Sequence, residues 1–156
     1  MIQSYFKKEP TLSFEVFPPK KDGELEQAFS ILDELGKLNP DFISVTYGAG
    51  GSKSKKTVEL ASYIQNNLHI QALAHLTCVG NTAAQIEAVI NELKANNVEH
   101  VLALRGDRPK DMTDEQFDSR EFAHASDLIH YLKEQAHLHI AGACYPEKHF
   151  ESFSME

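Results

Sequence analysis

Apolar residues recur along the chain in two alternating patterns. Short runs rich in β-branched residues predict five strands, at residues 12–17, 42–48, 72–78, 101–107 and 140–145. Between the first two runs, Leu25, Ala28, Phe29, Leu32 and Leu35 keep the spacing of one helix face. Strands that alternate with helices are typical of βαβ construction. The pattern therefore predicts five βα units, of which the last is cut short.

Three further stripes predict helices that face a core. The stripes consist of Thr57, Leu60, Ala61, Ile64 and Leu68, then Ile86, Val89, Ile90 and Leu93, then Ala125, Leu128, Ile129, Leu132 and Ala136. Thr82 and Gln85 stand at the spacing of a capping box, which predicts that the third helix begins just after Thr82.

The predicted strands begin at Leu12, Phe42, Ala72, Val101 and Ile140, and are therefore 30, 30, 29 and 39 residues apart. A TIM-type (β/α) barrel allots about 31 residues to each of its eight units. The long last step comes from a polar insertion at 108–121, which we expect to be a solvated loop. Five units could also form a flavodoxin-like open sheet. The spacing alone leaves both folds open.

Composition narrows the class of protein. With 156 residues and 42% hydrophobic residues, we expect a single domain spanning 1–156. A formal net charge of -8 disfavours nucleic acid and anionic membranes as partners. The two cysteines, Cys78 and Cys144, lie in apolar segments, and the N-terminal segment lacks the apolar run of a signal peptide. We therefore expect a cytoplasmic protein whose cysteines are buried apolar residues.

Polar or glycine-rich clusters follow four of the predicted strands. They are Thr46-Tyr47-Gly48-Ala49-Gly50-Gly51, His75-Leu76-Thr77-Cys78, Arg105-Gly106-Asp107 and Tyr145-Pro146-Glu147. Barrels and open α/β sheets both bind ligands at the carboxyl ends of their strands. The clusters therefore predict one site, assembled at that end of the sheet.

Glu15 is the polar exception inside the first predicted strand. If Glu15 is buried between Phe14 and Val16, its charged form is costly, so we expect a raised pKa and a carboxyl group able to donate a proton. The alternative is a structural pair with a neighbouring cation such as Arg105.

A zinc site offers a different interpretation of the strand ends. His75, Cys78 and His149 could act as zinc ligands in a barrel hydrolase, although their spacings match no standard zinc pattern. We expect no metal site.

The strand-end motifs together resemble the methylenetetrahydrofolate reductase family in order and spacing. The matching segments are Ser13-Phe14-Glu15-Val16-Phe17-Pro18-Pro19-Lys20, Phe42-Ile43-Ser44-Val45-Thr46-Tyr47-Gly48-Ala49, Ala74-His75-Leu76-Thr77-Cys78, Ala103-Leu104-Arg105-Gly106-Asp107, Ala125-Ser126-Asp127-Leu128 and Tyr145-Pro146-Glu147. The resemblance implies an eight-stranded TIM-type barrel, of which this chain covers about the first five βα units as the N-terminal portion. It further implies an FAD-dependent enzyme of one-carbon metabolism and methionine supply, which uses NAD(P)H to reduce methylenetetrahydrofolate to methyltetrahydrofolate.

The resemblance also implies roles for individual residues. Glu15 and Asp107 would be catalytic, Glu15 as the general acid and Asp107 beside both flavin and folate, with Thr46 also near the substrate. The expected FAD-binding residues are Thr46, Tyr47, Ala49, His75, Arg105, Gly106, Asp107, His124, Ala125, Tyr145 and His149. His124 stands where relatives commonly carry tyrosine, which leaves its backbone as the expected contact.

Two assembly hypotheses accompany this interpretation. We expect the enzyme to be a homo-oligomer that binds small molecules, with no nucleic-acid or membrane partner. A non-catalytic half-barrel fragment that associates with itself is the alternative, because an incomplete barrel exposes a strand edge.

Overall fold

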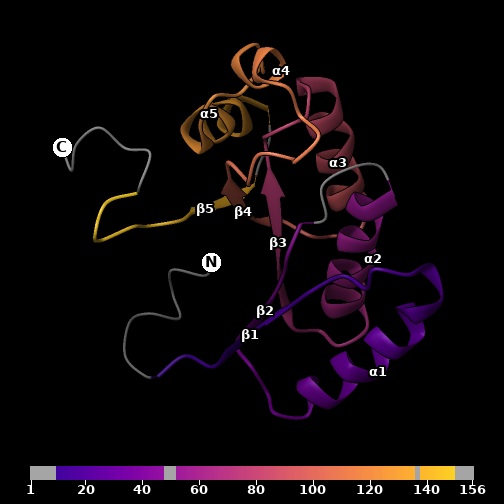
Figure 1. The fold of residues 1–156 in the computed structure, drawn as a ribbon. Helices are drawn as coiled ribbons and strands as arrows, with labels where there is room; N and C mark the ends of the chain where they lie inside the picture. Colours follow the sequence, from indigo (N-terminus) through magenta and orange to yellow (C-terminus); the bar gives the residue numbers. More distant parts are fainter. Residues whose placement is uncertain (1–9, 48–51, 136–137, 150–156) are drawn as a thin grey trace.

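A computed structural model describes residues 10–47, 52–135 and 138–149. Five parallel strands form one sheet in the order β1 (Ser13–Val16), β2 (Phe42–Val45), β3 (Gln71–Thr77), β4 (His100–Leu104) and β5 (His139–Gly142) (Figure 1). A flavodoxin-like sheet would place β1 between β2 and β3. The sequential order is instead that of a barrel wall, so the structure decides the alternative that spacing left open.

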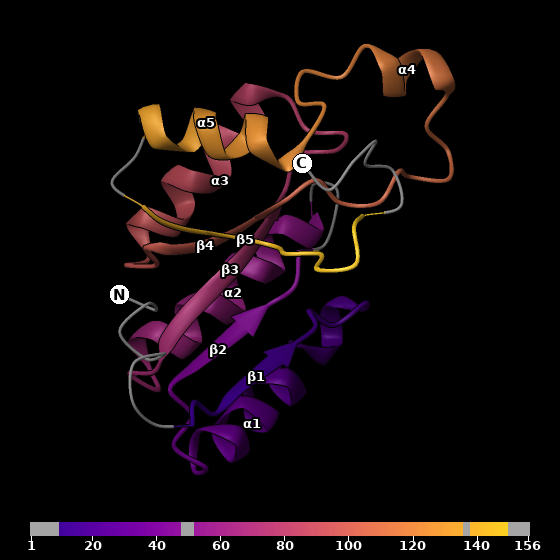
Figure 2. The same cartoon turned by 90° about the vertical axis from the view of Figure 1, so that its left-hand side faces the viewer.

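The four predicted helices are confirmed, although Leu68 lies beyond the end of the second and Ala136 lies outside the described residues. They are α1 (Leu25–Gly36), α2 (Ser52–Asn66), α3 (Ala83–Ala95) and α5 (Ala125–Gln135), and a 3-10 turn, η2 (Asp22–Glu24), precedes the first. The capping box of α3 is present, because Thr82 accepts a hydrogen bond from Gln85 N and the Gln85 side chain accepts one from Thr82 N. Figures 1 and 2 show α1, α2 and α3 following the strands along one side of the sheet.

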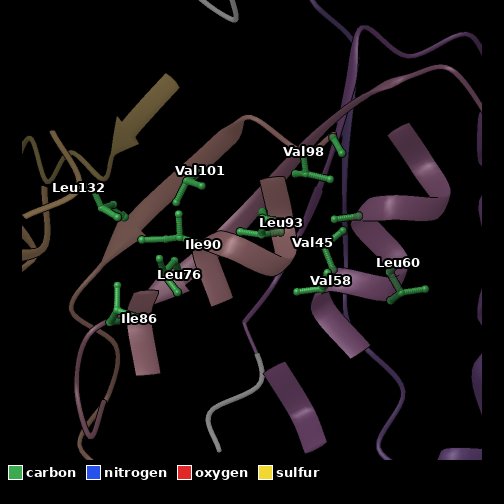
Figure 3. Packing of buried hydrophobic residues seen from close by; sticks show 14 of the residues in the cluster. Val45, Val58, Leu60, Leu76, Ile86, Ile90, Leu93, Val98, Val101 and Leu132 are labelled. Carbon is green, nitrogen blue, oxygen red and sulfur yellow. The ribbon is translucent and has the colours of Figure 1, made fainter. Parts of the chain in front are cut away.

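Alternation along the strands separates a core face from a cavity face. Ile43, Val45, Leu76 and Val101 are fully buried and pack against the helices. Figure 3 shows Ile90 of α3 beside Leu76 and Val101. Because neighbouring residues in a strand point to opposite faces, residues between these core positions face away from the helices.

The turns from helix to strand repeat in the first three units. Asn39, His69 and Asn97 have positive φ values of 50°, 55° and 60°, and each lies two or three residues before β2, β3 or β4. A left-handed residue after a helix is a common way to end it. The observed strands begin 29, 29, 29 and then 39 residues apart.

Two details of the predicted elements need correction. The strands end earlier than predicted, at Val16, Val45, Thr77, Leu104 and Gly142. The clusters that begin at Thr46, Arg105 and Tyr145 therefore follow their strands, whereas His75 and Thr77 lie inside β3. The insertion at 108–121 contains a short helix, α4 (Asp114–Asp118), because Thr113 and Gln116 form a second capping box.

No helix among the described residues is long and apolar enough to cross a membrane.

Candidate functional site

A cavity of about 1060 Å³ opens at the carboxyl ends of the strands. Its lining includes most of the predicted site residues: Thr46, Tyr47, His75, Arg105, Gly106, Asp107, His124, Ala125, Tyr145 and His149. These residues follow β2, β4 and β5, lie near the end of β3, or stand at the start of α5, so five separate segments of the sequence meet at one place. Ala49 was also predicted, but it lies outside the described residues.

Thr46 and Tyr47 extend from the end of β2 and are held by α2 and by the loop after β3. The backbone oxygen of Thr46 accepts a 3.0 Å hydrogen bond from the buried hydroxyl of Thr57. The Tyr47 side chain forms hydrogen bonds with Ser54 and Asn81, and burial raises the pKa of its phenol. Tyr47 therefore stays protonated at neutral pH.

Arg105, Gly106 and Asp107 continue the chain beyond β4 along the cavity wall. Val79 N donates a 2.8 Å hydrogen bond to Arg105 O, which extends the pairing of β3 with β4 beyond the strand ends. Gly106 has a φ of 83°, and a Cβ there would lie 2.8 Å from Thr77 Cβ and from Val79 Cγ1. Both the conformation and the space require glycine here.

Tyr145 and His149 form the wall after β5. Their rings meet edge to face, with centroids 4.7 Å apart and planes at 87°. A turn makes this possible, because Lys148 has a φ of 76° and donates its backbone N–H to Tyr145 O over 3.0 Å. Sequence reasoning placed both residues at the site, and the turn brings them together.

Glu15 does not line the cavity, but it contacts His75, which does. His75 Nε2 is 3.5 Å from Glu15 Oε2, although Nε2 forms no hydrogen bond among the described residues. Burial lowers the pKa of His75, and the nearby Glu15 charge opposes this shift without cancelling it. The imidazole is therefore neutral at pH 7, and the contact is not a full salt bridge.

Within this five-stranded part of the barrel, Glu15 is not buried by its sequence neighbours, contrary to the prediction. Phe14 and Val16 pack against the core, whereas the Glu15 side chain lies on the other face of β1 and is 52% exposed. Because a strand alternates its side chains, apolar neighbours in sequence do not surround Glu15 in space.

The cavity also has apolar lining that sequence reasoning did not single out. It includes Val79, Leu104, Ile129 and Ala143. Three of these residues lie at or just beyond strand ends: Val79, Leu104 and Ala143. Their position could have predicted that they line the site, but they carry no chemically active group that would have drawn attention to them. Apolar walls with a few convergent polar groups suit a flat ring system that has polar edges.

The zinc alternative has no geometric support within the described part of the chain. No group of three His, Cys, Asp or Glu side chains there is placed to hold a metal ion. Cys78 is fully buried, and its Sγ lies 3.7 Å from Arg105 O and 3.6 Å from His124 O. Cys144 corrects the expectation that both cysteines are buried, because it is exposed and lies beyond β5.

Known proteins similar to this chain agree with the fold. A solved 4-hydroxy-tetrahydrodipicolinate synthase from Methylacidiphilum fumariolicum aligns with a TM-score of 0.54 at 16% identity, over 90% of this chain and 46% of that one. At this level of identity the likeness concerns the fold alone. It agrees with a TIM-type barrel as the architecture.

Sequence relatives are more specific. A 5,10-methylenetetrahydrofolate reductase of Escherichia coli is 36% identical over 146 residues, which are 93% of this chain and 47% of that protein. Methylenetetrahydrofolate reductase (NADH) 1 of Arabidopsis thaliana is 37% identical over 141 residues, 88% of this chain and 24% of that protein. The chain thus spans about half the length of the bacterial relative and a quarter of the plant one. The sequence profile of the family described as methylenetetrahydrofolate reductase matches residues 1–156. A match over the whole chain, together with this cavity at the strand ends, shows that the chain belongs to the methylenetetrahydrofolate reductase family.

Proposed function

We propose that this chain forms the first five units of a (β/α) barrel that reduces methylenetetrahydrofolate to methyltetrahydrofolate with NAD(P)H, by way of bound FAD. One observation carries the proposal: residues from the ends of β2, β3, β4 and β5, each matched to a family motif, line a single cavity. Family membership supports the folate reaction, and the cavity supports a large cofactor.

The residues present fit a flavin dinucleotide. The cavity volume of about 1060 Å³ is at the upper end of the range for ligand pockets. Apolar lining from Val79, Leu104 and Ile129 suits a ring system, while Arg105 and His149 offer hydrogen-bond donors. When bound, FAD would supply the hydride chemistry that protein side chains lack.

Glu15 would supply a proton to the folate. As the methylene bridge opens, a carbon–nitrogen bond breaks, and the nitrogen keeps the electron pair and takes the proton. The half-exposed carboxyl group of Glu15 lies on the cavity face of β1, where substrate can approach it. His75 is neutral and holds its Nε2 3.5 Å from the carboxyl oxygen, so it leaves Glu15 without a fixed cationic partner on that side.

Asp107 and Thr46 would orient the folate. Both line the cavity, and they follow β4 and β2, which are separated by β3. A carboxylate accepts hydrogen bonds, whereas a hydroxyl can also donate one, so together they can recognise donors and acceptors on the edge of a pterin. Orientation of this kind lowers the barrier by holding the reacting atoms in line.

An anaerobic turnover assay tests the proposed function. The full-length protein with FAD should consume NAD(P)H only slowly without an acceptor, and should form methyltetrahydrofolate when methylenetetrahydrofolate is added. Product should be identified by mass spectrometry. Protein that holds FAD but forms no methyltetrahydrofolate would contradict the proposed reaction.

A further inference from the structure

The corner of the cavity at the start of α5 is held in place through its backbone. His124, Ala125 and Ser126 line the cavity there. The chain reaches this corner from Phe122, which is buried and packs edge to face against Tyr131 with ring centroids 5.6 Å apart. Between the buried Phe122 and the cavity, the orientation of the chain depends on contacts to the 123–124 backbone.

One carboxylate makes two of these contacts. Asp127 Oδ2 accepts hydrogen bonds of 2.9 Å from both Ala123 N and His124 N. The His124 oxygen in turn accepts a 3.1 Å hydrogen bond from Asp127 N, so residue 127 closes the first turn of α5 from both sides. Hydrogen bonds from backbone N–H groups to a charged carboxylate are among the stronger ones in proteins.

Two other side chains hold the carbonyl groups of the same turn. Arg120 Nη2 donates a 3.1 Å hydrogen bond to Ala123 O, and the thiol of Cys78 donates to His124 O over 3.6 Å. Cys78 Sγ also lies 3.7 Å from Arg105 O, so its one proton is shared between the turn and the cavity wall beyond β4. The N–H and C=O groups of residues 123 and 124 therefore all have hydrogen-bond partners. The Asp127 carboxylate accepts the hydrogen bonds of both N–H groups.

We propose that Asp127 is a positioning residue, whose carboxylate sets the orientation of the His124–Ser126 wall and thereby the affinity of the cavity for its cofactor. The inference rests on the proposed function of the cavity. It follows from geometry, because the side chain binds the backbone behind the wall through a single oxygen atom.

The test compares three variants in the full-length protein by FAD titration. Asp127→Ala removes the acceptor and should raise the FAD dissociation constant about tenfold or more, because two charge-assisted hydrogen bonds are lost. Asp127→Asn keeps an oxygen that can accept both hydrogen bonds and should restore most of the affinity. Asp41→Ala is the matched control, because Asp41 Oδ2 accepts a 2.9 Å hydrogen bond from Leu12 N, far from the cavity. It should lower the melting temperature without changing FAD affinity.

Hydrogen exchange provides a second measurement that does not need FAD. The amides of Ala123 and His124 should exchange about tenfold faster or more in Asp127→Ala, and unchanged in Asp41→Ala. Unchanged exchange at these amides would overturn the inference. So would faster exchange with wild-type FAD affinity, or equal losses of affinity in Asp127→Ala and Asp127→Asn. If the unmodified protein takes up no FAD, the proposed function fails, and amide exchange alone decides the role of Asp127.

Discussion

His75 and Glu15 meet across a neighbouring strand, with His75 Nε2 3.5 Å from Glu15 Oε2. β1 and β3 both pair with β2, and the β2 residue in register with Glu15 is Ser44. Because burial lowers the pKa of His75, this contact joins a neutral imidazole to a carboxyl group at pH 7. The geometry fits a carboxyl group that acts on a substrate better than one locked in an ion pair.

Glu15→Gln separates the two halves of the proposed reaction. An amide keeps the shape of the side chain but holds no transferable proton, so reduction of methylenetetrahydrofolate should nearly stop. Transfer from NAD(P)H to the flavin needs no acid and should stay within about threefold of the wild-type rate. Stopped-flow absorbance measures each half-reaction. Equal losses in both would mean that Glu15 has a structural role.

Asp107→Asn should raise the reduction potential of the bound flavin and weaken folate binding. A negative charge at the cavity wall disfavours an anionic reduced cofactor, so its removal should raise the potential by about 30 mV, equivalent to about 1.4 kcal/mol for two electrons. The amide also replaces one acceptor with a donor. Potentiometry and folate titration measure the two effects. If neither changes, Asp107 does not face the reacting groups.

The two cysteines should differ sharply in reactivity. Burial raises the pKa of the Cys78 thiol to about 11, so almost no thiolate is present at pH 7.5. Cys144 is exposed. Brief alkylation of the native protein, followed by peptide mass spectrometry, should label Cys144 well before Cys78. Comparable labelling of both would show that Cys78 is not enclosed beneath the His124 turn.

Acid should destabilise the fold through His100, at the start of β4. This side chain is buried, its Nδ1 accepts a 2.7 Å hydrogen bond from Gln71, and its ring lies against His139. Burial lowers its pKa from 6.5 to about 4, and repulsion from His139 adds to the shift. The unfolded chain therefore binds the proton more tightly than the folded chain. Stability is fully present above pH 6.5 and falls, by up to about 3 kcal/mol, as the pH approaches 4.

Urea unfolding at pH 7 and pH 4.5 measures this loss. His100→Asn keeps an acceptor for Gln71 without a titrating ring, so the difference between the two pH values should shrink. The exposed His130 provides a control, since His130→Gln should leave that difference nearly unchanged. A wild-type-like acid loss in His100→Asn would assign the pH dependence to other groups.

Periodicity predicted the elements well and their ends poorly. The helix stripes and strand runs depend on which residues face the core, and this is a local property of the sequence. Strand ends depend on where the regular ladder between neighbouring strands stops, as at Thr77 and Leu104, and that is a property of the sheet. The helix α4 shows a different failure: Thr113 and Gln116 carry the same capping signal as Thr82 and Gln85, but the polar character of the insertion concealed it.

The sequence predicted which residues line the site but not the contacts that hold them in place. Strand-end position and family motifs identified ten of the residues that line the cavity. The turn at Lys148 that joins Tyr145 to His149, and the contacts of Asp127 to the 123–124 backbone, depend on backbone geometry that residue types do not encode. The exposure of Glu15 was missed because its sequence neighbours were taken as its spatial neighbours.

The absorbance spectrum of the full-length protein, purified and then titrated with FAD, tests the central claim most directly. The account predicts a yellow protein, or a colourless one that takes up FAD in a saturable way, and release of intact FAD on denaturation because no covalent bond holds it. A full-length, folded protein that remains colourless and binds no added FAD would contradict the assignment of the strand-end cavity to a flavin.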